Sequence, residues 1–148
     1  MIEYGTCGHA AAIAEELEKL YPQAKCALEY EGEDWKLLAM ARLSAQCTDK
    51  RVNEVCKRLF EKYRSPYELA KGKLSDVENI VRPCGLYHVK ARDIIGEAVL
   101  LTEEYDGKLP DSMEELLRFP GVGRKVANLL LGDLFGKPAV VVDTHCIR

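Results

Sequence analysis

A short stretch near the end of the chain combines glycines with basic side chains. Residues 119–125 read FPGVGRK, so two glycines flank an apolar residue and a basic pair follows at once. The glycines allow a tight turn and a close approach of the backbone to another surface. A helix that begins at Arg124 would point N–H groups and its positive dipole end outward, and such amides can hold a phosphate. The residues predicted to contact the phosphate are Gly121, Val122, Gly123 and Arg124.

The alternative interpretation of this stretch is an ordinary pair of helices whose glycines serve only the turn. Arg124 and Lys125 argue against it. Basic side chains at a helix N-terminus oppose the helix dipole and carry a local cost in stability. A functional role is therefore the simpler explanation for the basic pair.

The surrounding sequence reads as one helix after another. Apolar residues lie nearly all round the helix expected at 35–46, which indicates a buried helix. The next helix has apolar residues at helical spacing from Val52 to Phe60 and can be capped by Thr48 or Asp49. The other expected helices cover residues 10–20, 87–105, 111–118 and 124–135, the last with Gly136 as its C-cap. In the helix at 87–105, the residues expected inside are Val89, Ile94, Ile95, Ala98, Val99 and Leu101.

Three capping boxes indicate short helices joined by tight turns. They begin at Ser65, Ser75 and Ser112, each followed three residues later by a glutamate. The β-like segment at 139–142 is alone, and one strand cannot make a sheet. We therefore predict an all-α fold, a multi-helix bundle whose hairpin spans residues 111–136.

Composition limits the class of protein without selecting one. Hydrophobic residues make up 47% and charged residues 30%, as in ordinary globular domains. No apolar run exceeds five residues, and the first residues lack the pattern of a secretory signal, so we expect a cytoplasmic protein without a membrane span. The net charge of −3 gives no global signature of a nucleic-acid binder, although residues 116–148 carry +3.

Four strings taken together resemble those of the endonuclease III-like DNA glycosylases of the helix-hairpin-helix superfamily. They are the hairpin at 119–125, VDTH at 142–145, LSAQCTD at 43–49 and GLYHVKA at 85–91. All four come in the family's order and approximate spacing. Within the hairpin, Phe119 and Val126 stand where leucine and threonine are more usual. The resemblance implies the family's helical barrel fold.

The resemblance also implies that Lys125 is a nucleophile and Asp143 its partner. A lysine attacks a sugar C1′ only as the free amine, and a helix N-terminus beside Arg124 favours that form. The carboxylate of Asp143 would stabilise positive charge on the sugar as the base leaves. The alternatives are a solvated surface lysine and an aspartate that only caps a helix beginning at Asp143. His145 would help to order that helix.

Two further residues match family positions that insert into the duplex, Gln46 and Leu86. An extrahelical base leaves a gap in the stack that inserted side chains can fill. Gln46 ends an expected helix and Leu86 follows Gly85, so both could project. Their alternatives are a surface polar residue and a core leucine.

The cysteine spacing and the resemblance together indicate whether these residues hold a cofactor. The six cysteines form no C-x-x-C pair, so no metal or cluster site is expected within these residues. Most endonuclease III-like proteins bind a [4Fe–4S] cluster through cysteines that would fall beyond residue 148.

We expect an N-terminal helical segment at 1–30, a helical barrel at 31–138, and the start of a second domain at 139–148, cut short before its fold is complete.

The implied function is that of a bifunctional DNA glycosylase and AP lyase of base excision repair. It would excise oxidised pyrimidines from double-stranded DNA, or act at abasic sites, as a monomer. A glycosylase for another lesion stays open. So do a non-catalytic hairpin module that grips phosphates and an inactive fragment of such an enzyme.

Overall fold

A computed structural model describes Gly5 and residues 7–143. This part of the chain is all-helical, as predicted, and contains no strand. None of its helices is long and apolar enough to cross a membrane. The helices are α1 (Cys7–Leu20), α2 (Asp34–Leu43), α3 (Asp49–Lys62), α4 (Pro66–Ala70), α5 (Leu74–Val81), the 3-10 helix η1 (Arg82–Cys84), α6 (Tyr87–Glu104), α7 (Met113–Leu116) and α8 (Arg124–Phe135).

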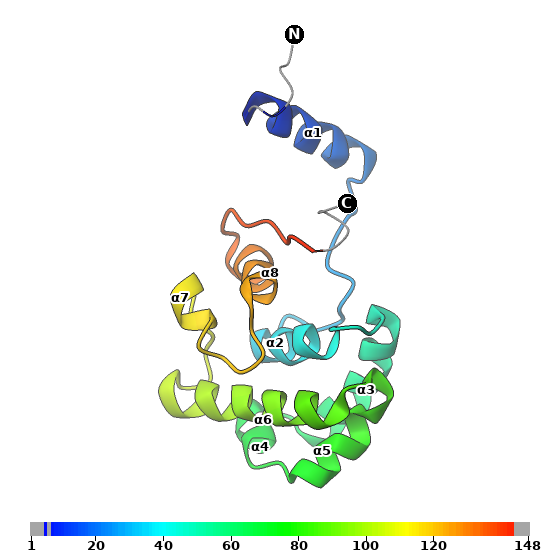
Figure 1. Ribbon diagram of the computed structural model, residues 1–148, viewed down its shortest axis with the longest axis vertical. Helices are drawn as coiled ribbons and strands as arrows, with labels where there is room; N and C mark the ends of the chain where they lie inside the picture. Colours follow the sequence, from blue (N-terminus) through cyan, green and yellow to red (C-terminus); the bar gives the residue numbers. More distant parts are fainter. Residues whose placement is uncertain (1–4, 6, 144–148) are drawn as a thin grey trace.

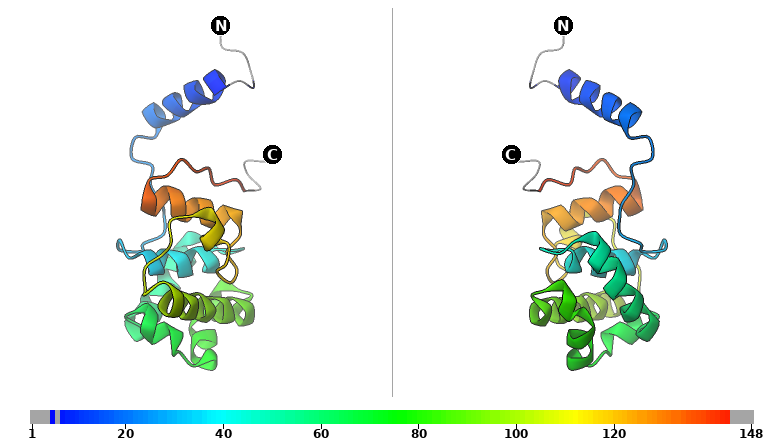
Figure 2. Two further views of the ribbon diagram at one scale, coloured as in Figure 1. Left: turned by 90° about the vertical axis from the view of Figure 1, so that its left-hand side faces the viewer. Right: turned by 90° about the vertical axis from the view of Figure 1, so that its right-hand side faces the viewer.

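Helix α2 lies at the centre of the packed part of the molecule. Helices α3 to α6 lie on one side of it, and α7 and α8 lie on the other (Figure 1). Leu37, Met40 and Leu43 of α2 are completely buried. Helix α1 stands apart from this body, and none of its residues is buried (Figures 1 and 2). The domain division expected near residue 30 stays a prediction.

The helix ends follow the expected capping residues in most places. Thr48, Ser65 and Ser112 each accept a hydrogen bond from a backbone N–H in the first turn of their helix. The capping box expected at Ser75 is wrong, because α5 already begins at Leu74 with Lys73 as its N-cap. Helix α2 ends at Leu43, three residues earlier than expected, and a turn follows it.

Two positions of α6 break its expected pattern of burial. Val89, predicted to lie inside, is 48% exposed. Glu97 is 1% exposed, and neither of its carboxyl oxygens has a hydrogen-bond partner among the described residues. Burial raises the pKa of Glu97 well above its ordinary value, although the Arg42 guanidinium opposes this shift. A carboxyl group whose burial favours the neutral form therefore lies in the core, beside a cavity of about 10 Å³.

Replacing Glu97 with leucine should stabilise the protein by about 1–3 kcal/mol at pH 7, because a buried unpaired polar group is removed. The folded chain holds the Glu97 proton to higher pH than the unfolded chain, which loses it above about pH 4.3. Stability of the natural chain should thus fall as pH rises above that value, by up to about 1.4 kcal/mol per unit. Urea unfolding at pH 5 and pH 7.5 should show a smaller difference in Glu97→Leu.

Glu103→Leu is the matched control for this substitution. Glu103 lies in the same helix but is exposed. This variant should keep the pH dependence of the natural chain. An equal loss of stability between the two pH values in Glu97→Leu and the natural chain would contradict the assignment of a neutral Glu97.

Candidate nucleic-acid interface

The turn between α7 and α8 is fixed by two apolar side chains that point into the core. Phe119 and Val122 are both buried, and the Phe119 ring stacks on Tyr105 with centroids 5.5 Å apart. The Val122 N–H donates to the Phe119 carbonyl oxygen over 3.1 Å. The amide of Val122 is therefore engaged within the turn. The phosphate contact expected of Val122 stays a prediction.

Gly121 approaches the protein's own ion pair closely. Its φ is +71°, and a Cβ built on it would lie 2.5 Å from Arg42 Cδ and 2.8 Å from Asp93 Oδ2. Arg42 Nε donates to Asp93 Oδ2 over 2.6 Å, with both side chains mostly buried. The hairpin backbone thus rests on a bond between α2 and α6. Only glycine combines this backbone angle with this closeness.

Gly123 differs from Gly121 in both respects. Its φ is −100°, and a Cβ built on it would meet nothing within 4 Å. Gly123 is the N-cap of α8, and the first backbone bond of the helix runs from the Ala127 N–H to the Gly123 oxygen, at 2.9 Å. The amides of the residues between them therefore point out of the helix end. This is the open side of the hairpin.

Arg124 and Lys125 stand exposed at this open end of α8. They come directly after the extended Gly123, so both side chains begin in the first turn of the helix. The helix N-terminus and the two cations together favour an anionic ligand. The start of α8 at Arg124 agrees with the sequence prediction, and the phosphate contacts of the hairpin stay a prediction.

Asp143 is the last residue that the structure describes, and it is partly buried. The chain leaves α8 at Gly136, and Ala139 then packs against Gly132 of the same helix. The segment returns over α8 in the direction of its N-terminal end (Figure 2). The expected pairing of Asp143 with Lys125 stays a prediction. The helix expected to begin at Asp143, with His145, lies outside the described residues.

Gln46 and Leu86 project from two separate turns. Both are exposed, Leu86 by 58%, so the alternative of a core leucine is wrong. Both adopt left-handed backbone angles, with φ of +53° at Gln46 and +48° at Leu86. Such angles are uncommon for residues other than glycine and mark sites where the surrounding structure imposes the conformation.

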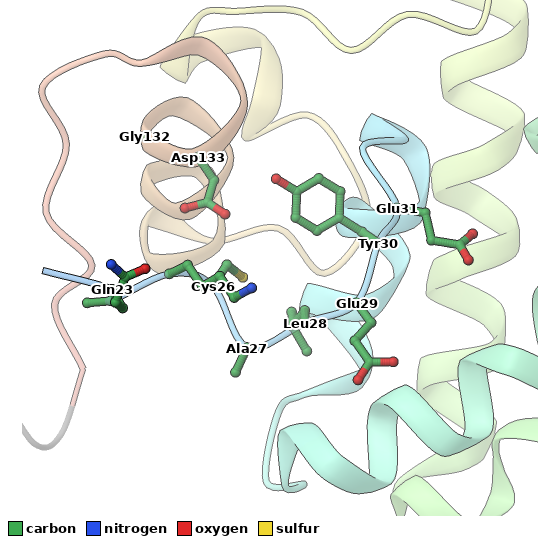
Figure 3. A pocket seen from close by; sticks show the side chains of 11 residues that line it. Gln23, Cys26, Ala27, Leu28, Glu29, Tyr30, Glu31, Gly132 and Asp133 are labelled. Carbon is green, nitrogen blue, oxygen red and sulfur yellow. The ribbon is translucent and has the colours of Figure 1, made fainter. Parts of the chain in front are cut away.

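A larger pocket lies at the opposite end of α8. It measures about 920 Å³ and is lined by residues 23–31 together with Gly132 and Asp133 (Figure 3). Burial raises the pKa of Cys26 and of Tyr30 in this pocket, and Asp133 adds to both shifts. About two helical turns separate Asp133 from Lys125 along α8. The pocket is therefore distinct from the open end of the hairpin.

The described residues do not fit a metal or an iron–sulfur cluster. No group of three or more His, Cys, Asp or Glu side chains in this part of the chain could hold a metal ion. Burial raises the pKa of Cys56, and it raises that of Cys84 to about 12. These thiols are therefore protonated, as expected for cysteines that behave as small apolar residues.

Four charged residues that are buried or mostly buried were not predicted from the sequence. They are Arg42, Asp93, Lys90 and Glu97. One indication was available: Lys90 and Glu97 recur at the same helical spacing as Ile94 and Leu101, on the core face of α6. The Arg42–Asp93 pair joins residues 51 positions apart and left no local trace.

The fold and the hairpin define a class of helical proteins in which a glycine turn leads directly into the basic N-terminus of a helix. Residues 39–148 match the HhH-GPD superfamily base excision DNA repair proteins. The chain belongs to this family.

Two relatives with similar sequences are both named endonuclease III. Endonuclease III of Synechocystis sp. is 46% identical over 133 residues, which are 89% of this chain and 60% of that protein. Endonuclease III of Thermotoga maritima is 41% identical, over 92% of this chain and 62% of that protein. The chain therefore spans somewhat less than two thirds of the length of these relatives.

Solved structures agree with the sequence comparison. A structure described as a non-covalent Endonuclease III-DNA complex matches with a TM-score of 0.86 and 42% identity, over 99% of this chain and 66% of that chain. A thermostable thymine-DNA glycosylase matches with a TM-score of 0.80 at 20% identity, which bears on the fold alone.

Proposed function

We propose that the chain carries the hairpin and lysine of a base excision repair DNA glycosylase and AP lyase that acts on oxidised pyrimidines. One observation carries this proposal above the others. Lys125 stands exposed in the first turn of α8, directly after a glycine turn whose inner side is held by the Arg42–Asp93 pair. A DNA backbone at the open side of this turn would lie beside the lysine.

The chemistry proposed for Lys125 is nucleophilic attack at a deoxyribose. The neutral Nζ bonds to C1′, and the bond from C1′ to the base breaks with its electron pair leaving on the base. Loss of an Nζ proton and opening of the sugar ring give an imine. Removal of a C2′ proton then expels the 3′ phosphate, and water hydrolyses the imine to restore the lysine. Asp143 would stabilise the positive charge that develops on the sugar.

The duplex would be held by contacts on two sides of the flipped nucleotide. The amides after Gly123 and the Arg124 side chain suit a phosphate, which fixes position without reading sequence. Gln46 and Leu86, both exposed at strained turns, suit insertion into the gap left by the flipped base. The preference for oxidised pyrimidines rests on the likeness to the endonuclease III relatives.

Borohydride trapping tests this proposal directly. The chain is mixed with a duplex that holds one abasic site, and borohydride reduces any imine to a stable covalent complex. We expect a covalent band, and we expect non-covalent binding to weaken steeply as salt rises from 50 to 200 mM, as is general for phosphate contacts. Binding without a covalent band would indicate a non-catalytic hairpin module. The absence of both binding and a covalent band would overturn the proposal for this chain.

A further inference from the structure

Lys90 is a completely buried lysine that the proposed chemistry does not use. Its exposure is 0%, and its Nζ donates to the Leu43 carbonyl oxygen over 2.9 Å and to the Cys84 carbonyl oxygen over 2.7 Å. Burial lowers the pKa of Lys90. Burying an ammonium group costs stability, and an apolar side chain of the same length would fill this space at lower cost. The hydrogen bonds that Lys90 donates therefore explain why a lysine occupies this buried position.

The two carbonyl groups that Lys90 binds each end a helix. Leu43 is the last residue of α2, and Cys84 is the last residue of η1. Carbonyls at a helix C-terminus lack partners within the helix and carry partial negative charge. The ammonium satisfies both at once, although Leu43 and Cys84 lie 41 positions apart in the sequence.

Each of these helix ends leads directly into a projecting turn. Gln46 follows Leu43 by three residues, and Leu86 follows Cys84 by two. Both turn residues adopt left-handed backbone angles. A conformation of this kind costs on the order of 1–3 kcal/mol and persists only where neighbouring contacts impose it. The Lys90 ammonium is the contact shared by the two turns.

The thiols near the two turns also influence each other. Burial raises the pKa of the Cys84 thiol and the Cys47 thiol adds to this shift, and Cys47 directly follows Gln46. The bases of the two turns are therefore adjacent in space. The exposed residues Gln46 and Leu86 therefore follow a common support that contains Lys90.

We propose that Lys90 is a positioning residue that fixes Gln46 and Leu86 relative to each other, so that the two side chains enter a DNA duplex as one preformed wedge. This inference rests on the proposed function. Two mobile turns would lose conformational freedom when they insert into the duplex, whereas a preformed wedge would not. Supporting residues of this kind determine how well a binding site is organised.

Lys90→Met is the informative variant, because it keeps the aliphatic length and removes the two donors. Lys90→Gln keeps an amide donor and should recover part of the loss, which also provides a test if Lys90→Met fails to fold. The matched control is Lys36→Met. Lys36 is also a buried lysine, but it lies at the other end of α2 and pairs with Glu31 and Glu33.

The first measurement is amide hydrogen exchange of the full chain without DNA. In Lys90→Met, exchange in residues 44–47 and in residues 84–88 should be roughly tenfold faster, because both turns open locally. Exchange in α3 and α4 should stay as in the natural chain. Lys36→Met should leave both turns unchanged. Natural exchange rates in either turn of Lys90→Met would overturn the proposal.

The second measurement reports insertion. The probe is a duplex in which 2-aminopurine lies opposite a tetrahydrofuran abasic analogue, so that unstacking raises its fluorescence. We expect Lys90→Met to lose most of the fluorescence gain at saturating protein and to bind about tenfold more weakly, equivalent to about 1.4 kcal/mol. The salt dependence of binding should be kept, because the hairpin is untouched.

A combined variant separates positioning from a general structural role. Added to Gln46→Ala and Leu86→Ala, Lys90→Met should cause no further loss of fluorescence, since residues that act through one another are not additive. A further loss of fluorescence in the combined variant would overturn the proposal. So would a full gain of fluorescence in Lys90→Met alone. If the natural chain binds no abasic duplex, the proposed function fails and the insertion role fails with it. The exchange measurement then decides separately whether Lys90 holds the turns.

Discussion

Lys125→Ala should eliminate the covalent band in borohydride trapping, a loss on the order of 10³-fold or more, because no other group would supply the imine nitrogen. Lys125 is exposed at the start of α8, so removal of its side chain leaves no cavity and exposes no buried partner. Thermal stability should therefore stay close to that of the natural chain. Affinity for the abasic duplex should fall only slightly, by the loss of one charge.

Arg124→Ala is the control for this loss. Arg124 is the neighbouring exposed cation of the same helix turn, and its removal should weaken binding and reduce the salt slope by about one phosphate contact. At saturating protein, Arg124→Ala should still give the covalent band. Asp143→Asn should trap slowly if the carboxylate acts on the charged sugar. A normal covalent band with Lys125→Ala would show that another amine forms the imine, and the role assigned to Lys125 would be wrong.

Gly121→Ala should have the second large effect, a destabilisation of about 2–5 kcal/mol. A side chain at a left-handed φ costs roughly 1–2 kcal/mol, and overpacking of a filled site adds about 1–3 kcal/mol. The new Cβ would overlap Arg42 beside its bond to Asp93. For a chain of this size, the melting temperature should fall by roughly 2–4 °C for each kcal/mol lost.

Gly123→Ala is the matched substitution on the other side of the turn. Its Cβ would enter open space at an ordinary backbone angle, so stability should change little. Binding to duplex DNA should nevertheless weaken, because the methyl group would stand where a phosphate approaches the amides of α8. The two variants therefore separate the glycine that the fold requires from the one that the ligand requires. Equal melting temperatures for both variants would contradict this distinction.

Features that depend on neighbouring residues were predictable from the sequence. Ser65 and Ser112 cap helices as expected, because a hydroxyl and a backbone N–H three residues on meet within one turn. The C-cap at Gly136 and the start of α8 at Arg124 are confirmed for the same reason. The error at Ser75 has a local cause as well, since the backbone entered the helix at Leu74 without a side-chain cap.

Features that depend on distant residues were not predictable in this way. Leu86 was open to two interpretations, because its exposure depends on where η1 and α6 meet. Val89 was expected inside, and the structure shows that the contacts of α6 leave it outside. The bond from the Val122 N–H to the Phe119 carbonyl group was not predictable either, and the phosphate contact expected of Val122 stays a prediction.

The sequence by itself determined an all-helical chain with a glycine turn followed by Arg124 and Lys125, because periodicity, capping and turn chemistry act over a few residues. The tertiary structure alone decided which glycine faces inward and what supports the projecting turns. Gly121 meets Arg42, whose partner Asp93 is 51 positions away, and Lys90 reaches a carbonyl 47 positions away. Such contacts form only when packed helices bring distant residues together, and burial then fixes the cost and the role of each charge.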